Sequence, residues 1–583
     1  MKSTMQVIPL SVARILKYGA VAHRNTVVST YFGDEADETT FGEIAIRAAA
    51  FANTLVEEFG IGIGDRVATF LSNCTEHLEA LLSIASMGAV FNPINRFLMD
   101  DQITHIINHA EPRVIVVDPA YAERLVPLLD DCPSVAGLIV IGPKTAKVQA
   151  VEELTHDLTR HVRVLGYEAS MDGRSCDYDW PILPETDPAA ICYSTGTEGA
   201  PKGVVYSHRA LWLHSLNLRT ADSFGIRNGT PFLCCVPIYH VLSWGVPLAA
   251  FMSGAPMVFT GRTASPEHLA HVIASAMPRQ AHGSPAVWTS LMVHYGEHPP
   301  KKMSLQEIYS GGSPVSPALI AAWEEQFGVD MIHCWGMTET GPVGTVAHPP
   351  AGVAGAARAR YRDSQGRFQV GMEYRIVDDD GTVLEANDRN AGELHLRGNT
   401  VTGSYYHSPT QDGVFSSGDG DAADAHADAA VFRGEPVEDA ASRFTPDGWL
   451  RTGDIATVNE DGYLTVHDRK ADVIRSGGEW IYSAALENYL MEPQAVVEAA
   501  VIGIPDDKWG QRPLAVVQMH PGVPKDADTA QLMADMLAKK APGWMVPEYW
   551  TFVDHIDKTS VDKFDKKDLR EHFRRGDFDV FRL

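Results

Sequence analysis

The chain has 583 residues, more than one hydrophobic core usually holds, so we expect at least two domains. Hydrophobic residues make up 45% of the chain and charged residues 21%, close to the globular average, which excludes a disordered or fibrous protein. The formal net charge of −27 repels nucleic acid and anionic membranes, and because the sequence shows no basic patch to oppose it, we expect neither as a partner.

The N-terminal stretch and the cysteines together predict a cytoplasmic protein. Pro9 and Arg14 interrupt the first 20 residues before an apolar core of signal-peptide length develops, so no targeting signal is expected. The seven cysteines include no C-x-x-C pair, which argues against a disulfide framework and against a zinc site.

Short apolar runs rich in β-forming residues alternate with helical patterns along the N-terminal part of the chain. Strand patterns occupy 66–73, 113–119 and 137–142, and helical patterns occupy 76–88 and 120–131. This alternation is typical of βαβ units around largely parallel sheets. The sequence therefore predicts an α/β fold, with a large N-terminal domain made of several α/β sheets.

A segment without charged residues, 228–261, is long enough to span a bilayer. It is punctuated by prolines at 231, 237, 247 and 256, which a membrane helix of this length would not carry. We interpret it as a buried strand, helix and strand, and expect no integral membrane segment.

The composition changes twice toward the C-terminus. Residues 407–443 are rich in Asp, Ala, Gly and Ser, which predicts a solvated loop. Asp419, Asp421 and Asp424 lie close together there, but their spacing departs from the EF-hand template, so we expect no metal.

After Asp468 the pattern indicates a compact α+β module, with strands at 495–507 and 513–520 and an amphipathic helix at 528–541. We place the boundary at 470, which predicts an N-terminal domain of residues 1–470 and a C-terminal domain of residues 471–583.

A loop of glycines and hydroxyl residues follows the apolar run 189–193, and Lys202 closes it. Its glycines let backbone N–H groups approach a phosphate, and the lysine adds positive charge. It is not a Walker A loop, because Pro201 precedes the lysine and β-branched residues follow, so we expect it to join two strands. An ordinary turn is the structural alternative. The candidate phosphate-binding residues are Ser194, Thr195, Gly196, Thr197, Gly199 and Lys202.

The stretch from Tyr193 to Gly203 resembles the phosphate-binding signature of the adenylate-forming (AMP-binding) superfamily, although Glu198 stands where Thr is usual. That superfamily comprises acyl-CoA synthetases, luciferases and peptide-synthetase adenylation domains. Further motifs follow in the family's order and extend the resemblance over nearly the whole chain: 310–313, 334–340, 448–454, 468–469, 476–480 and 559–563.

Several motif residues also have suitable chemistry of their own. Trp335 can stack on adenine, Thr338 can donate to a phosphate, and Glu339 can hold Mg²⁺ as a hard oxygen ligand. Asp454 lies in an expected turn where it could accept both ribose hydroxyls, assisted by Arg469. A core tryptophan and a turn-forming aspartate are the structural alternatives. The resemblance implies that nucleotide and CoA binding also involve Gly311, Gly336, Gly477, Gly478 and Trp480.

For Lys563 the resemblance implies the catalytic lysine that bridges the attacking carboxylate and the α-phosphate, although an exposed lysine is usually only solvated. The residue before that lysine is generally Gly in the family, whereas this chain has Asp562, whose carboxylate could pair with Lys563 and compete with the substrate.

The segment from Pro237 to Trp244 resembles the aromatic motif between the acyl pocket and the pantetheine tunnel of fatty-acid-type acyl-CoA synthetases. His240 is a candidate for both catalysis and substrate contact, and a satisfied core histidine is the alternative. No Asp stands ready for a substrate amine, which favours an apolar fatty, branched or aryl acid. The candidate substrate residues are His240, Val241, Trp244, Gly312 and Met337.

The resemblance implies an AMP-forming acyl-CoA synthetase that uses ATP, Mg²⁺ and coenzyme A. The acid attacks the α-phosphate of MgATP, the mobile C-terminal domain rotates about a hinge near 469–472, where Ala471 replaces the usual charged residue, and CoA then displaces AMP. The alternatives are a CoA-independent acyl-AMP ligase, a luciferase-type oxygenase and a catalytically impaired nucleotide-binding regulator. The sequence leaves monomer and homodimer open.

Overall fold

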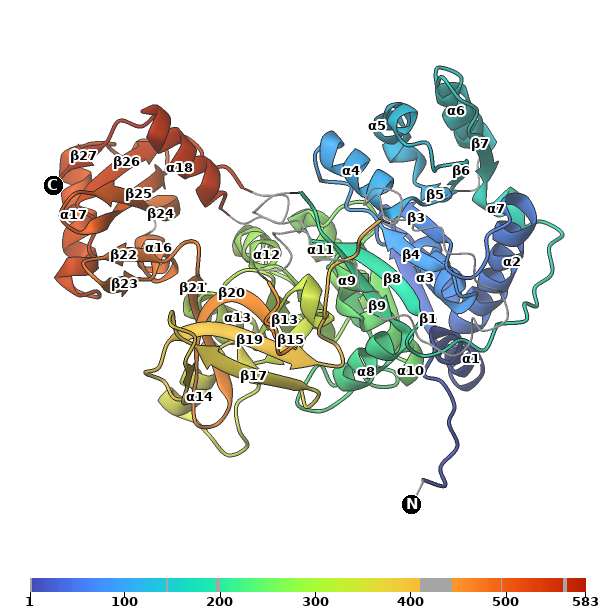
Figure 1. Ribbon diagram of the computed structural model, residues 1–583, viewed down its shortest axis with the longest axis horizontal. Helices are drawn as coiled ribbons and strands as arrows, with labels where there is room; N and C mark the ends of the chain where they lie inside the picture. Colours follow the sequence, from blue (N-terminus) through green and yellow to red (C-terminus); the bar gives the residue numbers. More distant parts are fainter. Residues whose placement is uncertain (1–2, 143–144, 195–199, 409–442, 494, 559–563) are drawn as a thin grey trace. The chain divides into compact units, whose positions relative to one another are not determined.

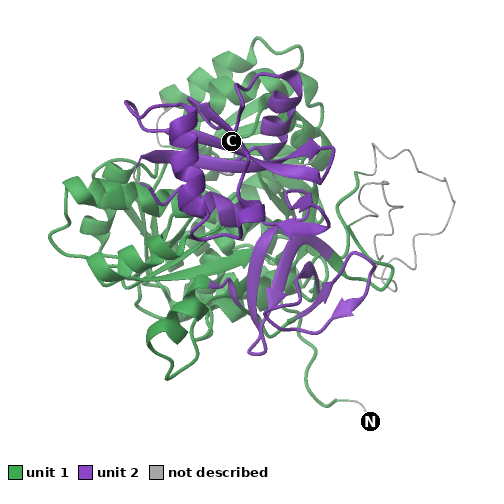
Figure 2. Cartoon of the chain, turned by 90° about the vertical axis from the view of Figure 1, so that its left-hand side faces the viewer, with its two compact units in different colours: residues 1–363, 367–372, 397–450 green, residues 364–366, 373–396, 451–583 purple. Residues whose placement is uncertain are grey.

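The computed structural model describes residues 3–142, 145–194, 200–408, 443–493, 495–558 and 564–583 (Figure 1). Contacts divide the chain into two compact units, coloured separately in Figure 2. Unit 1 comprises residues 1–363, 367–372 and 397–450, and unit 2 comprises residues 364–366, 373–396 and 451–583. Unit 2 thus takes in segments before 470, while the predicted domain boundary at that residue stays a prediction.

The first sheet of unit 1 has seven strands and confirms the predicted βαβ units. All neighbouring strands are parallel except the last pair, β8 and β9. The strands, in spatial order, are β7 (Arg163–Gly166), β6 (Gly137–Val140), β5 (Val114–Val117), β3 (Arg66–Phe70), β4 (Val90–Pro93), β8 (Pro188–Tyr193) and β9 (Gly203–Ser207).

The second sheet of unit 1 is parallel from β14 to β1, with antiparallel strands at either side. Its spatial order is β16 (Gly366–Phe368), β15 (Val343–Val346), β14 (Asp330–Gly336), β13 (Glu307–Gly311), β12 (Gln280–Gly283), β10 (Phe232–Cys234), β11 (Met257–Phe259), β1 (Val27–Tyr31) and β2 (Ala36–Thr40).

Helices join these strands, and most of them bury apolar residues. In α2, for example, a capping box between Thr40 and Glu43 begins the helix, and Gly60 ends it in a left-handed conformation. The helices of unit 1 are α1 (Val12–Ala22), α2 (Phe41–Phe59), α3 (Thr75–Ser86), α4 (Asp100–Ala110), α5 (Ala122–Leu125), α6 (Thr145–Thr155), α7 (Tyr167–Met171), α8 (His208–Leu218), α9 (Val241–Trp244), α10 (Val246–Ser253), α11 (Pro266–Ala276), α12 (Pro285–Glu297), α13 (Pro317–Phe327) and α14 (Gly355–Asp363).

The predicted helix at 120–131 differs from the structure. Only α5 is α-helical there, and tighter 3₁₀ turns flank it at Pro119–Tyr121 and Val126–Asp131. Both turns carry a proline at their start, where the missing N–H and the fixed φ interrupt α-helical hydrogen bonding.

Unit 2 contains two sets of hydrogen-bonded strands. The first has the order β18 (Val383–Leu384), β17 (Met372–Val377), β19 (Gly392–Gly398), β20 (Leu450–Val458) and β21 (Tyr463–Arg469). The second has the order β23 (Glu479–Ile481), β22 (Ile474–Ser476), β25 (Gly510–Met519), β26 (Tyr549–Val553) and β27 (Phe581–Arg582), with β24 (Val496–Asp506) on β25. The helices are α16 (Ser483–Leu490), α17 (Ala527–Leu537) and α18 (Lys566–Arg575). The strands and the helix predicted after 495 are confirmed.

The charge-free segment forms β10, α9, α10 and β11, as predicted, and most of its apolar residues are buried. No helix within the described residues is both long and apolar enough to cross a bilayer. All seven cysteines are free thiols, which agrees with the expectation of no disulfide framework. The predicted α/β fold, with a large N-terminal and a small C-terminal part, is confirmed.

Candidate functional site

The two ends of the phosphate loop are held together by antiparallel strands. β8 ends at Tyr193 and β9 begins at Gly203, and these two residues are register partners. Beyond them, the Ser194 N–H donates to the Lys202 carbonyl at 2.9 Å, and the Lys202 N–H donates to Ser194 Oγ at 3.2 Å. The prediction that this loop joins two strands is confirmed. Thr195, Gly196, Thr197 and Gly199 lie outside the described residues.

The second motif begins where β14 ends. The register of the strand shifts between Trp335 and Gly336, and a 3₁₀ turn, Thr338–Thr340, follows. Trp335 is half-buried, with its ring close to Gly344, where a Cβ would lie 2.9 Å from the indole. The Met337 N–H donates to Thr340 Oγ1 at 3.0 Å, which holds the turn closed.

Glu339 is buried, with 6% of its surface exposed. Its Oε1 accepts a hydrogen bond of 2.6 Å from the Tyr405 hydroxyl, and its carbonyl accepts one of 2.8 Å from the Thr402 N–H. The Lys202 ammonium lies 5.4 Å from the centre of the Tyr405 ring. Tyr405 therefore contacts both residues: its hydroxyl binds Glu339, the proposed metal ligand, and its ring lies beside Lys202 of the phosphate loop.

Tyr405 and Tyr206 are site residues that sequence reasoning missed. Tyr405 is 66 positions from Glu339, and Tyr206, on β9, donates its hydroxyl to the Thr338 carbonyl. Neither tyrosine lies in a motif with a recognisable spacing. Only the packing of distant segments identifies them.

Glycine stands at three positions of the motifs for different structural reasons. A Cβ on Gly311 would lie 2.2 Å from the Cys334 carbonyl, and one on Gly336 would lie 2.0 Å from the Pro342 carbonyl, so both are required by packing. Gly312 instead has φ of +85°, and a Cβ there would have nothing within 4 Å of it. Of the three, Gly312 is the one beside open space, which suits its predicted substrate role.

The predicted acyl motif contains an unusual backbone. Val241, Leu242, Ser243 and Trp244 all have φ between 46° and 57°, so α9 is a left-handed turn made of non-glycine residues. This conformation costs about 1 to 2 kcal/mol per residue. Strain of this kind is typical of functional sites and needs support from its surroundings.

Buried polar side chains supply that support. Ser243 Oγ donates to the Val236 carbonyl at 2.7 Å and lies 3.1 Å from His282 Nε2. Burial lowers the pKa of His282 to about 4, which keeps the ring neutral at physiological pH. The Trp244 ring packs edge-on against His282 at 5.3 Å. His240, half-buried, precedes the turn with its ring 4.8 Å from that of Tyr239.

Asp454 and Arg469 lie opposite each other on β20 and β21 of unit 2. Arg469 Nη1 is 3.0 Å from Asp454 Oδ1, and the aspartate is 2% exposed. The expected turn at Asp454 is wrong: the residue lies inside a strand, because the positive φ of Gly453, 74°, is accommodated without ending the ladder. The predicted role of the two residues in ribose binding stays a prediction.

The glycines Gly477 and Gly478 form the two-residue turn between β22 and β23, with φ of 62° and 89°. Trp480 follows on β23, opposite Arg475, whose guanidinium lies 5.7 Å from the indole centre. A Cβ on Gly477 would meet the Trp509 ring at 2.7 Å, whereas Gly478 has nothing within 4 Å.

A buried charge cluster begins three positions after the predicted catalytic lysine in the chain. Lys566 Nζ, at the start of α18, is 2.8 Å from Glu487 Oε1 and donates to Ser483 Oγ at 2.8 Å. Ser483 in turn donates to Asp468 at the end of β21. Burial raises the pKa of the Glu487 and Asp468 carboxyls. Burial alone would lower the pKa of Lys566, but the negative charges of Glu487 and Asp468 outweigh it, and the pKa of Lys566 is raised. Asp562 and Lys563 lie outside the described residues, as does most of the acidic segment.

The side chains of unit 1 fit a magnesium ion that arrives with a nucleotide. Glu339 offers a buried carboxylate that accepts a hydrogen bond from a neutral hydroxyl, and within the described part of the chain no cation forms an ion pair with it. Carboxylate oxygen is a preferred ligand of Mg²⁺. Thr338 and Lys202 belong to the same unit and can act on the accompanying phosphates.

Residues 18–406 match the AMP-binding enzyme family, and residues 485–563 match the AMP-binding enzyme C-terminal domain. A 3-methylmercaptopropionyl-CoA ligase of Ruegeria lacuscaerulensis is 32% identical over 98% of this chain and 99% of its own. A medium-chain-fatty-acid–CoA ligase of Ectopseudomonas oleovorans is 31% identical over 97% and 96%. The resemblance predicted from the motifs is confirmed.

Solved structures share the fold. An anthranilate CoA ligase in complex with anthranoyl-AMP superposes with a TM-score of 0.80 at 21% identity, covering 99% of this chain and 100% of the other. ATP-bound MatB from Rhodopseudomonas palustris gives a TM-score of 0.77 at 23% identity, covering 97% and 99%.

Proposed function

The chain belongs to the AMP-binding enzyme family, and on that premise we propose that it is an AMP-forming carboxylic acid–CoA ligase for an apolar acid. The acid is activated by MgATP to acyl-AMP with release of pyrophosphate, and the acyl group is then transferred to the thiol of CoA. The observation that carries this proposal is the buried Glu339 carboxylate, held by Tyr405, whose ring contacts Lys202 of the phosphate loop.

Different residues of unit 1 have different roles in the first half-reaction. Lys202 and Thr338 donate to the phosphates, where negative charge develops as the carboxylate attacks. Glu339 binds Mg²⁺, which supplies charge neutralisation to the triphosphate when bound. Tyr405 orients Glu339, and Tyr206 fixes the turn through the Thr338 carbonyl. In unit 2, Asp454 and Arg469 hold the ribose.

Lys563 completes the first half-reaction as the bridge between the attacking carboxylate and the α-phosphate. Rotation of the C-terminal domain then removes it, and the turn Gly477–Gly478 with Trp480 faces CoA. Lys563→Ala should therefore suppress pyrophosphate release by several orders of magnitude and leave CoA transfer from preformed acyl-AMP largely intact. Equal loss in both half-reactions would contradict this role. Asp562→Gly, as a companion variant, should leave adenylation equal or faster.

The relatives named above act on fatty and short thioether acids, which supports an apolar acid for this chain as well. We assign the wall of the acyl pocket to His240, Val241 and Trp244, with Gly312 and Met337 nearer the nucleotide. The Trp244 ring should favour short, branched or aromatic acids. Trp244→Gly should shift preference upward in chain length, by about fourfold in kcat/KM for each additional buried methylene. An unchanged profile from C4 to C16 would remove Trp244 from the pocket.

The deciding experiment supplies ATP, CoA and a panel of carboxylic acids, and measures AMP and acyl-CoA. Formation of both supports the ligase. AMP release that does not depend on CoA would support an acyl-AMP ligase, and nucleotide binding without turnover would support a regulator. A cytoplasmic location remains a prediction. The choice between a monomer and a homodimer also remains to be tested.

A further inference from the structure

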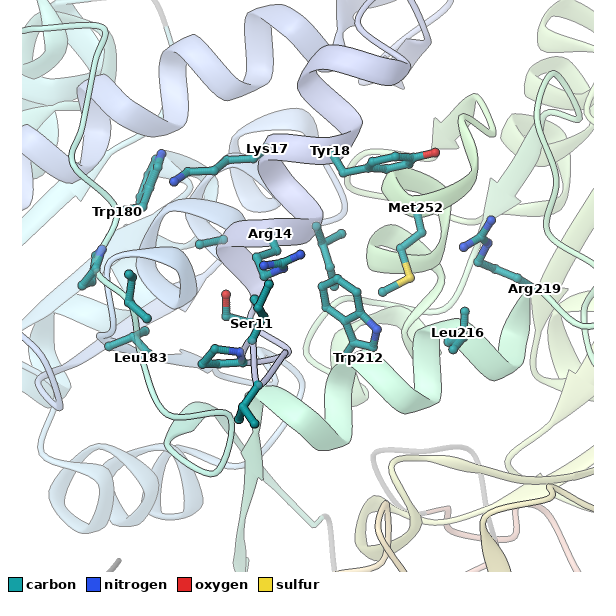
Figure 3. A pocket seen from close by; sticks show the side chains of 17 residues that line it. Ser11, Arg14, Lys17, Tyr18, Trp180, Leu183, Trp212, Leu216, Arg219 and Met252 are labelled. Carbon is teal, nitrogen blue, oxygen red and sulfur yellow. The ribbon is translucent and has the colours of Figure 1, made fainter. Parts of the chain in front are cut away.

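A groove of ≈ 750 Å³ opens on unit 1 outside the motifs described above (Figure 3). It is bounded by the N-terminal segment 7–11, by α1, by the segment 180–183, by α8 with the residue that follows it, and by Met252 of α10. This volume lies within the range of small-molecule sites, about 300 to 1,000 Å³. None of its lining residues belongs to the phosphate loop, the acyl motif or the nucleotide motifs.

The wall of the groove is predominantly apolar. Trp212 on α8 and Met252 on α10 lie on one side of it, and Trp180 and Leu183 lie on the other (Figure 3). Ile182 beside them is 89% exposed. Exposed apolar residues are common one by one, but a contiguous hollow lined by two tryptophans marks a binding surface.

Three cations stand at the edge of this apolar hollow. Arg14 and Lys17 come from α1, and Arg219 follows the end of α8. In Figure 3, Lys17 extends toward Trp180, while Arg219 lies beyond Met252. Within the residues that the structure describes, no carboxylate forms an ion pair with any of the three. Their positive charges are therefore not neutralised by a described carboxylate, although the chain has a formal net charge of −27.

We propose that this groove binds a single-chain amphiphile with an anionic head group, of which a long-chain carboxylate is the simplest example. The aliphatic chain would lie against Trp212, Met252 and Leu183, because burying apolar surface there removes it from water. The head group would meet Arg14, Lys17 or Arg219, whose positive charges complement it. The site is separate from the acyl pocket of the proposed reaction.

A hollow favours one inserted chain over the flat surface of a bilayer, since a membrane contacts protruding residues rather than the floor of a groove. The overall charge of −27 also opposes approach to an anionic membrane, whereas a single head group needs only local donors. Anionic vesicles and self-association of the chain are therefore alternative outcomes of the test.

The test measures binding of dodecanoate and of dodecyl phosphate to the full chain by titration calorimetry, with the acyl pocket saturated by a non-hydrolysable acyl-adenylate analogue. The two probes distinguish a carboxylate from a phosphate head group. We expect one additional site whose affinity rises about fourfold per methylene from C8 to C12. Arg14→Glu with Arg219→Glu should weaken it at least tenfold.

The matched control is Lys301→Glu with Lys302→Glu, which changes the net charge equally at exposed lysines outside the groove. It should bind within twofold of the unmodified chain. Trp212→Ala, which keeps all three cations, should also weaken binding and reduce the gain per methylene. Equal binding by all variants would overturn the proposal. So would binding only to phosphatidylglycerol vesicles, or a groove variant that changes the mass of the particle in solution.

Discussion

Unit 1 and unit 2 each bury a carboxylate, but the two carboxylates have opposite kinds of partner. Glu339 in unit 1 receives a hydrogen bond from a neutral tyrosine, whereas Glu487 in unit 2 is paired with the Lys566 ammonium. A carboxylate held by a neutral donor keeps its charge for an incoming cation. A carboxylate paired with lysine is already neutralised, so it can anchor structure but is a poor metal ligand.

The same contrast extends to the titrating groups. Unit 1 buries five histidines whose pKa burial lowers, to about 3 for His77 and to about 4 for His208, His214, His282 and His333. Unit 2 places its buried charge in the lysine cluster, where the pKa of Lys566 is raised. The two units should therefore lose stability at opposite ends of the pH scale.

Acidification should produce the largest effect, and mainly in unit 1. A histidine whose folded pKa is lowered stabilises the fold above pH 6.5, and that stability is lost as the pH falls from 6.5 through the folded pKa. One pH unit below 6.5, each such group costs about 1.4 kcal/mol. Burial raises the pKa of Glu79 to about 7 and also raises the pKa of Glu76, Asp187 and Asp363, and these carboxyls act in the opposite direction and offset part of the loss.

Hydrogen exchange at pH 7.5 and pH 5.5, corrected for intrinsic rates, measures this prediction. We expect protection to fall in unit 1 and to change little in unit 2, where His467 has a lowered pKa and His572 a raised one. Lys566 contributes stability below pH 10.5 that is lost as the pH rises through its higher folded pKa. A uniform loss of protection in both units at pH 5.5 would contradict the comparison.

Lys566→Met should destabilise unit 2 by about 3 to 5 kcal/mol, because it leaves Glu487 and Asp468 buried without a cation. Combining it with Glu487→Leu should recover much of the loss, since an apolar pair of similar volume replaces a salt bridge well. Urea unfolding measures both. Lys539→Met, at an exposed lysine of the same unit, is the control and should change stability by less than about 0.5 kcal/mol.

Glu339→Gln tests the other carboxylate. Its amide oxygen can still accept from Tyr405, so the fold should survive, but the charge for Mg²⁺ is gone. We expect kcat for pyrophosphate release to fall by about 100- to 1,000-fold. Glu487→Gln, the matched change in unit 2, should lower stability more than it lowers kcat at a temperature where the protein is folded. If Glu339→Gln mainly lowered stability and Glu487→Gln mainly lowered kcat, the roles assigned to the two carboxylates would be wrong.

Tyr405→Phe should have the smallest effect. It removes one hydrogen bond from Glu339 and keeps the ring near Lys202, so we expect about a tenfold loss in adenylation. If Tyr405 only orients the carboxylate, higher Mg²⁺ concentrations should restore part of the rate. A loss that Mg²⁺ does not relieve would mean that the hydroxyl acts on the substrate itself.

Sequence reasoning predicted the features that depend on local pattern. The alternation of strands and helices and the strand–loop–strand form of the phosphate loop each follow from neighbouring residues. The order of the motifs predicted the family, because glycines and charges at set spacings remain visible without a fold. Where local reasoning was wrong, as in placing Asp454 in a turn, a single glycine was interpreted as the end of a strand.

Tertiary structure alone decided which distant residues meet. Tyr405 reaches Glu339 across 66 positions, and His282 supports a left-handed turn that no local propensity favours. Folding also places Arg14, Lys17 and Arg219, which are far apart in the sequence, at the edge of one apolar groove. The physical reason is common to all three: such contacts arise from the packing of whole sheets and helices, and their energy comes from burial that no short stretch of sequence contains.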